Sequence, residues 1–180
     1  MIIAVTGAKA AGKSASLLKS AEILKSRNVS VAGIISKRIW KEGKRYGYEL
    51  IDLSSNSSQL LAAEEDLEGD VIKHCTFSFR QKALTDGVNA IIWGCGADVL
   101  IVDEVGNMEA SGGGWSKAFP YIMKRTEPIL LGVREDAVGK LSEMGLPPDK
   151  IITVLPENND VSGIILKTLK SHLPSVGMAL

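Results

Sequence analysis

The chain has 180 residues, of which 45% are hydrophobic and 23% are charged. This length and composition are typical of one globular domain and exclude disordered, collagen-like and fibrous proteins. The 21 basic residues balance the 21 acidic ones, and this zero net charge argues against a protein whose main task is to hold nucleic-acid backbones or anionic membranes.

Short apolar runs alternate along the chain with segments of helical spacing. The runs cover residues 1–6, 29–36, 98–104, 128–133 and 151–156, and the helical spacing covers residues 14–26, 79–95, 115–125, 135–144 and 158–171. The runs are continuously apolar, as is typical of parallel strands that helices cover on both faces. The alternation predicts an α/β fold of three layers with a mostly parallel central sheet.

A break in this alternation occurs at residues 37–45. The segment separates two β-rich runs and carries Gly43, which predicts an added β-hairpin with Gly43 at its tip. Five of its nine residues are basic: Lys37, Arg38, Lys41, Lys44 and Arg45. We interpret these charges as keeping the tip soluble and discouraging edge pairing. Contact with phosphates or RNA is the alternative.

The rest of the chain gives no sign of a second domain, an export signal or a membrane span. Residues 54–59 and 111–115 are the most loop-like, and both are too short to link domains. The two cysteines form no CxxC pair, which fits reduced thiols. We therefore expect one domain over residues 1–173, a frayed tail over residues 174–180, and a cytoplasmic protein with no membrane contact.

The first chemical motif is GAKAAGKS, from Gly7 to Ser14, which fits G-x-x-x-x-G-K-[ST] between an expected strand and an expected helix. Glycines let such a loop wrap around an anion, and N–H groups at the helix N-terminus supply positive charge. Lys13 is placed to reach the β- and γ-phosphates, and Ser14 to ligate Mg²⁺. The predicted nucleotide-binding residues are Gly7, Ala8, Lys9, Ala10, Ala11, Gly12, Lys13, Ser14 and Ala15.

The second motif is an acidic pair, Asp103 and Glu104, at the end of the apolar run 98–104. This is a Walker B pattern, in which Asp103 holds Mg²⁺ and Glu104 orients or deprotonates the attacking water. The predicted catalytic residues are thus Glu104 and Lys13, and the predicted metal ligands are Ser14 and Asp103.

Two classes of P-loop protein are disfavoured. Regulatory GTPases usually have a glycine after the metal aspartate and read guanine with N-K-x-D, which is missing from this sequence. Another class has a second lysine directly after the first glycine, where this chain has Ala8. Lys9 lies one position after the place of that second lysine. We therefore expect it to be exposed to solvent or to make only a minor contact with the phosphates.

These motifs occur with the segments VAGIISKRI, YGYELIDL, IVDEVGNME, PILLGV and PENND in an order similar to that of the nucleoside-triphosphatase family that includes cancer-related nucleoside triphosphatase. The resemblance covers most of residues 1–170. It implies a RecA-like P-loop domain that slowly hydrolyses ATP, GTP and other nucleoside triphosphates with Mg²⁺. The residues that match the family motifs are Gly7, Gly12, Lys13, Ser14, Asp103 and Glu104. Relatives usually carry lysine at the position of Asn107 and arginine at that of Asn159.

Four further residues are candidates for the site. Arg134 ends a predicted strand and is either a cation for the γ-phosphate or a surface charge. Glu109 is a candidate for contact with metal-bound water or with a neighbouring loop. Asn158 and Asn159 follow the last strand, where open α/β sheets bind ligands, although Asn158 equally suits a helix cap.

The leading hypothesis is a Mg²⁺-dependent triphosphatase that uses water to cleave the β–γ bond of ATP, GTP and related nucleotides. One alternative is a nucleotide or small-molecule kinase, in which another acceptor replaces water. Another is a nucleotide-dependent switch whose moving part is the loop 106–114. A nucleic-acid partner is not favoured, and the sequence leaves the oligomeric state open.

Overall fold

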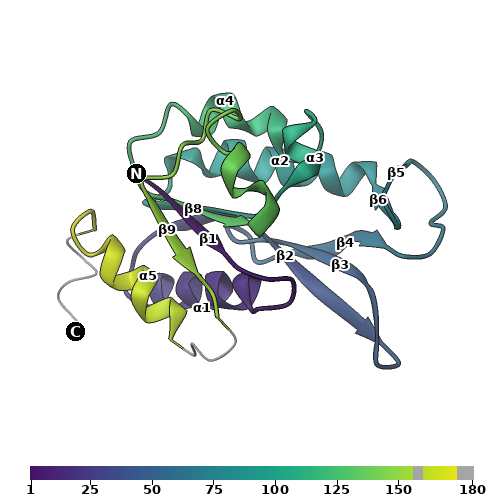
Figure 1. Ribbon diagram of the computed structural model, residues 1–180, viewed down its shortest axis with the longest axis horizontal. Helices are drawn as coiled ribbons and strands as arrows, with labels where there is room; N and C mark the ends of the chain where they lie inside the picture. The colour runs from purple at the N-terminus through teal and green to yellow at the C-terminus, as the bar shows by residue number, and fades with distance from the viewer. Residues whose placement is uncertain (156–159, 174–180) are drawn as a thin grey trace.

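The computed structural model describes residues 1–155 and 160–173, and the strands among them form one nine-stranded sheet (Figure 1). The strand order is β5-β6-β4-β3-β2-β7-β8-β1-β9. The order places β1, which precedes the glycine-rich loop, two strands away from β7, which carries the acidic pair. Because these strands run parallel, the glycine-rich loop and the acidic pair both lie at the carboxyl ends of the strands, on the same side of the sheet.

The five strands at one end of the sheet are parallel, as the sequence predicts. They are β2 (Val31–Lys41), β7 (Val99–Val105), β8 (Ile129–Val133), β1 (Ile2–Thr6) and β9 (Lys150–Thr153). All five residues of β8 are buried, and most of β1 and β7 are buried too. Continuous burial explains why these strands are apolar throughout rather than at alternate positions.

The other end of the sheet is antiparallel and larger than the expected hairpin. The hairpin itself is present, because β2 pairs with β3 (Lys44–Asp52) around Glu42 and Gly43. Three more strands extend it: β4 (Ser58–Ala63), β6 (Phe77–Arg80) and β5 (Val71–His74). The prediction of a loop over residues 54–59 is wrong at Ser58 and Gln59, which pair with β3 through backbone groups that need no apolar side chain.

Helices cover both faces of the sheet (Figure 1). On one face, α1 (Lys13–Ser26) packs against α5 (Val161–Leu169), and their apolar side chains form one core with β1 and β9. On the other face lie α2 (Gln81–Trp93), α3 (Asn107–Ala110) and α4 (Phe119–Ile122), with the short 3₁₀ helices η1 (Gly94–Gly96) and η2 (Ser116–Ala118). The second core joins α2 and α4 to the sheet. This three-layer α/β arrangement confirms the predicted fold class.

Three predicted helices differ from the structure. Of the helix expected over residues 115–125, only the 3₁₀ helix η2 and the four-residue α4 form. The helix expected over residues 79–95 begins at Gln81, because Phe79 pairs with Ile72 and Ala62 in the sheet. Residues 135–144 form no α-helix, and only Glu135–Lys140 turn as the 3₁₀ helix η3. This tighter form is common in short connecting segments. Within residues 1–155 and 160–173, no helix combines the length and the apolar character needed to cross a membrane.

Candidate active site

The loop between β1 and α1 is shaped by glycines at its two ends. Gly7 has a φ of 145°, and a side chain there would collide with the Val154 carbonyl. Gly12 has a φ of 103° and caps α1 without any side-chain hydrogen bond. The first turn of α1 also lacks an acidic residue. The N-terminus of α1 therefore keeps its partial positive charge for an anion.

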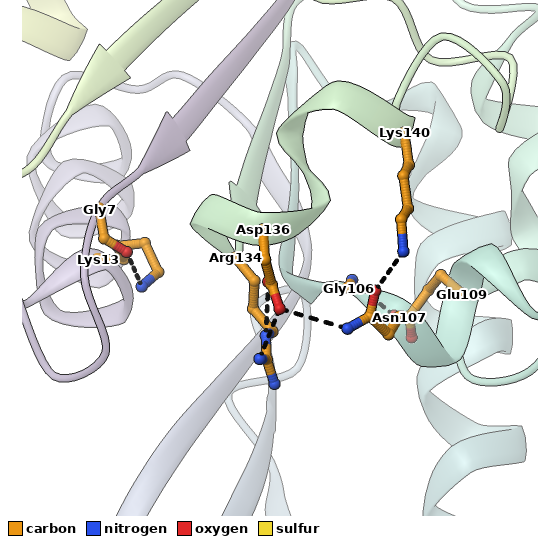
Figure 2. Close-up of polar contacts among 8 residues, drawn as sticks. All are labelled: Gly7, Lys13, Gly106, Asn107, Glu109, Arg134, Asp136 and Lys140. Atoms are coloured by element: carbon orange, nitrogen blue, oxygen red, sulfur yellow. Dashed lines mark hydrogen bonds and ion pairs between the residues drawn. The ribbon is translucent and has the colours of Figure 1, made fainter.

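Lys13 folds back over this loop. Its Nζ atom donates to the Gly7 carbonyl at 2.9 Å (Figure 2). It also donates to the Ala8 carbonyl at 3.2 Å. The side chain is buried, whereas Lys9 is exposed at the rim of the same loop. The ammonium group is thus held at the mouth of the loop, within reach of an anion bound there.

Asp103 lies at the end of β7 with none of its surface exposed. Its Oδ2 atom accepts a hydrogen bond from the Ser36 amide at 3.2 Å, and its Oδ1 atom has no partner. Gly132 of β8 makes room for this Oδ1, because any side chain there would overlap it. Burial raises the pKa of Asp103, and the neighbouring Glu104 raises it further, while the Ser14 hydroxyl and the Ser36 amide lower it.

Glu104 stands in a distorted part of β7. The register between β7 and β8 shifts between Val102 and Val105, and Glu104 has a φ of 61°. Such a conformation costs about 1–3 kcal/mol for a residue other than glycine and is found where a bulge redirects a side chain. Here the bulge directs Glu104 into the cavities beside the loop, which it lines.

The two cavities around the loop share Ala10, Lys13, Arg38, Tyr48 and Glu104 in their walls. The larger, of about 390 Å³, lies beside Gly7 and is called the P-loop cavity below. The smaller, of about 260 Å³, is lined by Gly12, Ser14 and Ala15 at the start of α1. Of the predicted nucleotide-binding residues, Ala8 and Ala11 line neither cavity.

Arg134 follows β8 and lines the P-loop cavity, but its guanidinium group is bound to a carboxylate. It donates to both oxygens of Asp136, at 3.1 and 2.9 Å, and this ion pair raises the pKa of Arg134. Asp136 also accepts from Asn107, which in turn accepts from Lys140 at 2.8 Å (Figure 2). The chain of contacts ties the start of η3 to α3.

Glu109 contacts a neighbouring loop. Its carboxylate accepts from the amide of Gly106 at 2.7 Å and from that of Trp115 at 3.2 Å, and it is 5% exposed. Burial raises its pKa. Both bonds close the loop 106–114, the segment expected to move in a switch. Among the described residues, no hydrogen bond links Glu109 to Ser14 or Asp103, the two predicted metal ligands.

Sequence reasoning missed two side chains of the site, Ser36 and Tyr48, and gave a phosphate contact for Arg38 only as an alternative. Arg38 and Tyr48 face each other across the β2–β3 hairpin and line both cavities. The Nε atom of Arg38 is buried without a partner, as is the hydroxyl of Ser36, which lines the smaller cavity. This position favours the alternative interpretation of Arg38, a contact with phosphates, over a charge that only keeps the hairpin soluble. In the sequence, the basic cluster at residues 37–45 was the only signal for Arg38. The candidate residues Asn158 and Asn159 lie outside the described residues.

Comparisons with known proteins support a nucleotide-hydrolysing family. The sequence model of the family described as NTPase matches residues 2–167. The chain is 32% identical over 161 residues to nucleoside-triphosphatase THEP1 of Methanocaldococcus jannaschii, covering 89% of this chain and 91% of that protein. It is 27% identical to the cancer-related nucleoside-triphosphatase homolog of Bos taurus, with 95% of each chain covered.

Two solved structures share the fold. The solution structure of a human cancer-related nucleoside triphosphatase superposes with a TM-score of 0.72 at 21% identity, covering 94% of this chain and 97% of that one. The crystal structure of THEP1 from Aquifex aeolicus superposes with a TM-score of 0.63 at 19% identity, covering 94% and 99%. At these identities the likeness concerns the arrangement of the elements.

Proposed function

Because the chain belongs to the NTPase family and is a P-loop nucleoside triphosphatase, we propose that it slowly hydrolyses ATP, GTP and other nucleoside triphosphates with Mg²⁺ and water. The products are the nucleoside diphosphate and phosphate. The observation that carries this proposal is the bulge that turns Glu104 into the P-loop cavity next to the buried Asp103.

The glycine-rich loop binds the phosphates. The uncapped N-terminus of α1 offers its amides, and Lys13 exchanges its bonds with the Gly7 and Ala8 carbonyls for oxygens of the β- and γ-phosphates. The loop cradles a triphosphate without reading the base, which is consistent with broad nucleotide specificity.

Ser14 and Asp103 fit a magnesium ion. The Oδ1 atom of Asp103 is buried and unpartnered, and burial together with the neighbouring Glu104 raises the pKa of this carboxyl. A cation bound here would offset both effects. Ser14 and Asp103 would hold the ion together with phosphate oxygens and water, which is how Mg²⁺ is usually bound in nucleotide sites. When bound, Mg²⁺ neutralises charge on the β- and γ-phosphate oxygens.

Glu104 prepares the water. Its carboxylate accepts a proton from a water placed in line with the γ-phosphate, and the water oxygen forms the new bond to the γ-phosphorus. The bond from that phosphorus to the β–γ bridging oxygen breaks, and the nucleoside diphosphate leaves with that oxygen. Arg38 is the cation that we place against the γ-phosphate oxygens, since Arg134 is held by Asp136. A single arginine supplied from within the chain is consistent with slow turnover.

The test is phosphate release from ATP, GTP, CTP and UTP, each with Mg²⁺ and with excess chelator. The proposal predicts release from all four nucleotides and none in chelator. An Asp103→Asn variant should need a higher Mg²⁺ concentration for half-maximal rate, while Asp98→Asn, a change at an exposed carboxylate bonded to Ser30, should not. Release from a single nucleotide, or undiminished release in chelator, would contradict the proposal.

A further inference from the structure

A third cavity, of about 250 Å³, lies on the other side of Glu104, toward α2 and α3, and its walls are mostly apolar. Four aromatic side chains line it: Tyr48, Phe77, Phe79 and Trp115. Leu61 and Leu84 add aliphatic surface. The rings of Tyr48 and Phe77 lie 5.3 Å apart, and those of Phe77 and Phe79 lie 6.2 Å apart. We call this space the aromatic cavity.

The aromatic cavity adjoins the two cavities around the loop. It shares four residues with them, Ser36, Tyr48, Glu104 and Arg134, and all four carry polar groups. The apolar side chains of Leu61, Phe77, Phe79 and Leu84 line the aromatic cavity and neither of the other two. A molecule in it therefore has an apolar environment for its body and polar groups at the end that faces the γ-phosphate.

The polar end has capacity for one more hydrogen-bonding group. The Ser36 hydroxyl is 2% exposed and has no partner, which is costly for a buried polar atom unless a ligand binds it. Two of the charged groups in the lining are already engaged, because Arg134 is paired with Asp136 and Glu109 with two amides. The carboxylate of Glu104 and the imidazole of His74 also line the cavity, and each can bind a hydroxyl group. A neutral ligand with a hydroxyl group fits this arrangement better than a charged one.

The volume sets the size of the ligand. An enclosed apolar cavity of about 150 Å³ takes up one benzene molecule, so the aromatic cavity has room for one or two fused rings. Stacking against Tyr48, Phe77 or Trp115 favours an aromatic body over an aliphatic chain.

We propose that the aromatic cavity binds a small neutral aromatic alcohol and presents its hydroxyl to Glu104 as an acceptor for the γ-phosphoryl group. This rests on the proposed function, because it uses the same nucleotide site. The alcohol oxygen forms the new bond to the γ-phosphorus, and the bond from that phosphorus to the β–γ bridging oxygen breaks. The nucleoside diphosphate leaves with that oxygen. The alcohol proton passes to Glu104 and then to solvent.

The test uses 5-hydroxyindole as acceptor and indole as its matched analogue without the hydroxyl. Binding of both is measured by ligand-observed NMR with Mg²⁺ and a non-hydrolysable ATP analogue. Transfer is measured with γ-labelled ATP, by separating labelled organic phosphate from labelled inorganic phosphate. We expect both compounds to bind, and only 5-hydroxyindole to take up label.

Variants that fill the aromatic cavity test whether binding and phosphoryl transfer take place in it. Met108 lines the cavity and is partly buried, and Cys75 is an exposed lining residue where a larger side chain does not disturb the core. Met108→Trp and Cys75→Trp should each weaken binding and transfer by about tenfold or more, a loss of about 1.4 kcal/mol. Met108→Leu and Cys75→Ser are the matched controls and should resemble the wild type.

Phosphate release from ATP without either compound separates this proposal from the proposed function, because all four variants should retain it. The acceptor proposal is overturned if neither compound binds at millimolar concentration, if both tryptophan variants bind as well as the wild type, or if 5-hydroxyindole binds and receives no label. Loss of phosphate release in the wild type would instead overturn the proposed function.

Discussion

At the scale of single residues, the site depends on side chains whose polar atoms are buried before any ligand arrives. The Asp103 Oδ1, the Ser36 hydroxyl and the Arg38 Nε are all buried without partners in the protein. Unpaired buried polar atoms each cost about 1–3 kcal/mol. Their concentration near one glycine-rich loop therefore indicates that this part of the protein is built to hold polar ligand groups.

Arg38 provides the first prediction. Arg38→Ala should lower kcat for ATP hydrolysis by roughly 10- to 150-fold, which corresponds to the loss of one charged hydrogen bond of about 1.5–3 kcal/mol. KM should change much less, because the contact strengthens as charge develops on the γ-phosphate. Steady-state kinetics of phosphate release measure both constants.

Lys44→Ala is the matched control for Arg38, since Lys44 is an exposed cation in the same hairpin and lines neither of the cavities around the loop. It should leave kcat within about twofold, as expected for a solvated surface charge. Equal losses in the two variants would mean that the hairpin acts through its overall charge, and no loss in Arg38→Ala would remove this residue from the site.

At the scale of elements, the segment from Gly106 to Trp115 is fixed by one carboxylate. Glu109→Ala would leave the buried amides of Gly106 and Trp115 without an acceptor. We expect a fall in the free energy of unfolding of about 2–6 kcal/mol, from about 1–3 kcal/mol for each of the two unpaired amides. Urea unfolding followed by fluorescence measures this change.

Glu109→Gln separates the hydrogen bonds from the charge. The amide oxygen keeps one acceptor, and the raised pKa of Glu109 shows that burial disfavours the charged form. The loss should therefore be about half of that in Glu109→Ala, at about 1–3 kcal/mol for the one remaining unpaired amide. Losses of the same size in both variants would show that the carboxylate charge, rather than its two acceptor oxygens, holds the loop.

The elements also show how far the sequence alone predicts the structure. The parallel strands and α1 follow from continuous apolar runs and helical spacing, because each pattern is local. The strands β4, β5 and β6 were not predicted, since they are short, lie toward an edge of the sheet and mix polar with apolar residues. β4 pairs with β3, β6 pairs with β4, and β5 pairs with β6. These contacts form only when the chain folds, so no local sequence pattern predicts them.

The residues of the site likewise fall into those that the sequence predicts and those that it does not. The loop residues and the pair Asp103–Glu104 are recognisable as motifs, because their spacing along the chain is fixed by the phosphates and metal they serve. Arg38, Tyr48 and Ser36 reach the cavities through strand pairing, which no short motif encodes. The partner of Arg134, Asp136, stands only two residues away, but its carboxylate is placed by the turn into η3.

At the scale of the whole molecule, both cores pack against the same parallel strands, and we expect residues 1–173 to unfold as one cooperative unit. A non-hydrolysable ATP analogue with Mg²⁺, at about 100 times its Kd, adds about 2.7 kcal/mol of stability. For a protein of this size that corresponds to a rise in Tm of about 5–11 °C. Calorimetry should show one transition that moves as a whole.

The chelator and the loop variant complete this experiment. Excess chelator should remove most of the shift in Tm, and Lys13→Ala should reduce it at equal nucleotide concentration, because the ammonium group no longer meets the phosphates. Two separate transitions, of which only one responds to nucleotide, would contradict a single folding unit.

The central claim is that Glu104, turned into the P-loop cavity by the bulge in β7, activates the attacking water. The most direct measurement compares single-turnover hydrolysis of ATP by the wild type and by Glu104→Gln, with the Kd for the nucleotide measured in parallel. The account predicts a Kd within a few-fold of the wild type and a hydrolysis rate lower by about 10²-fold or more. An unchanged hydrolysis rate in Glu104→Gln would contradict it.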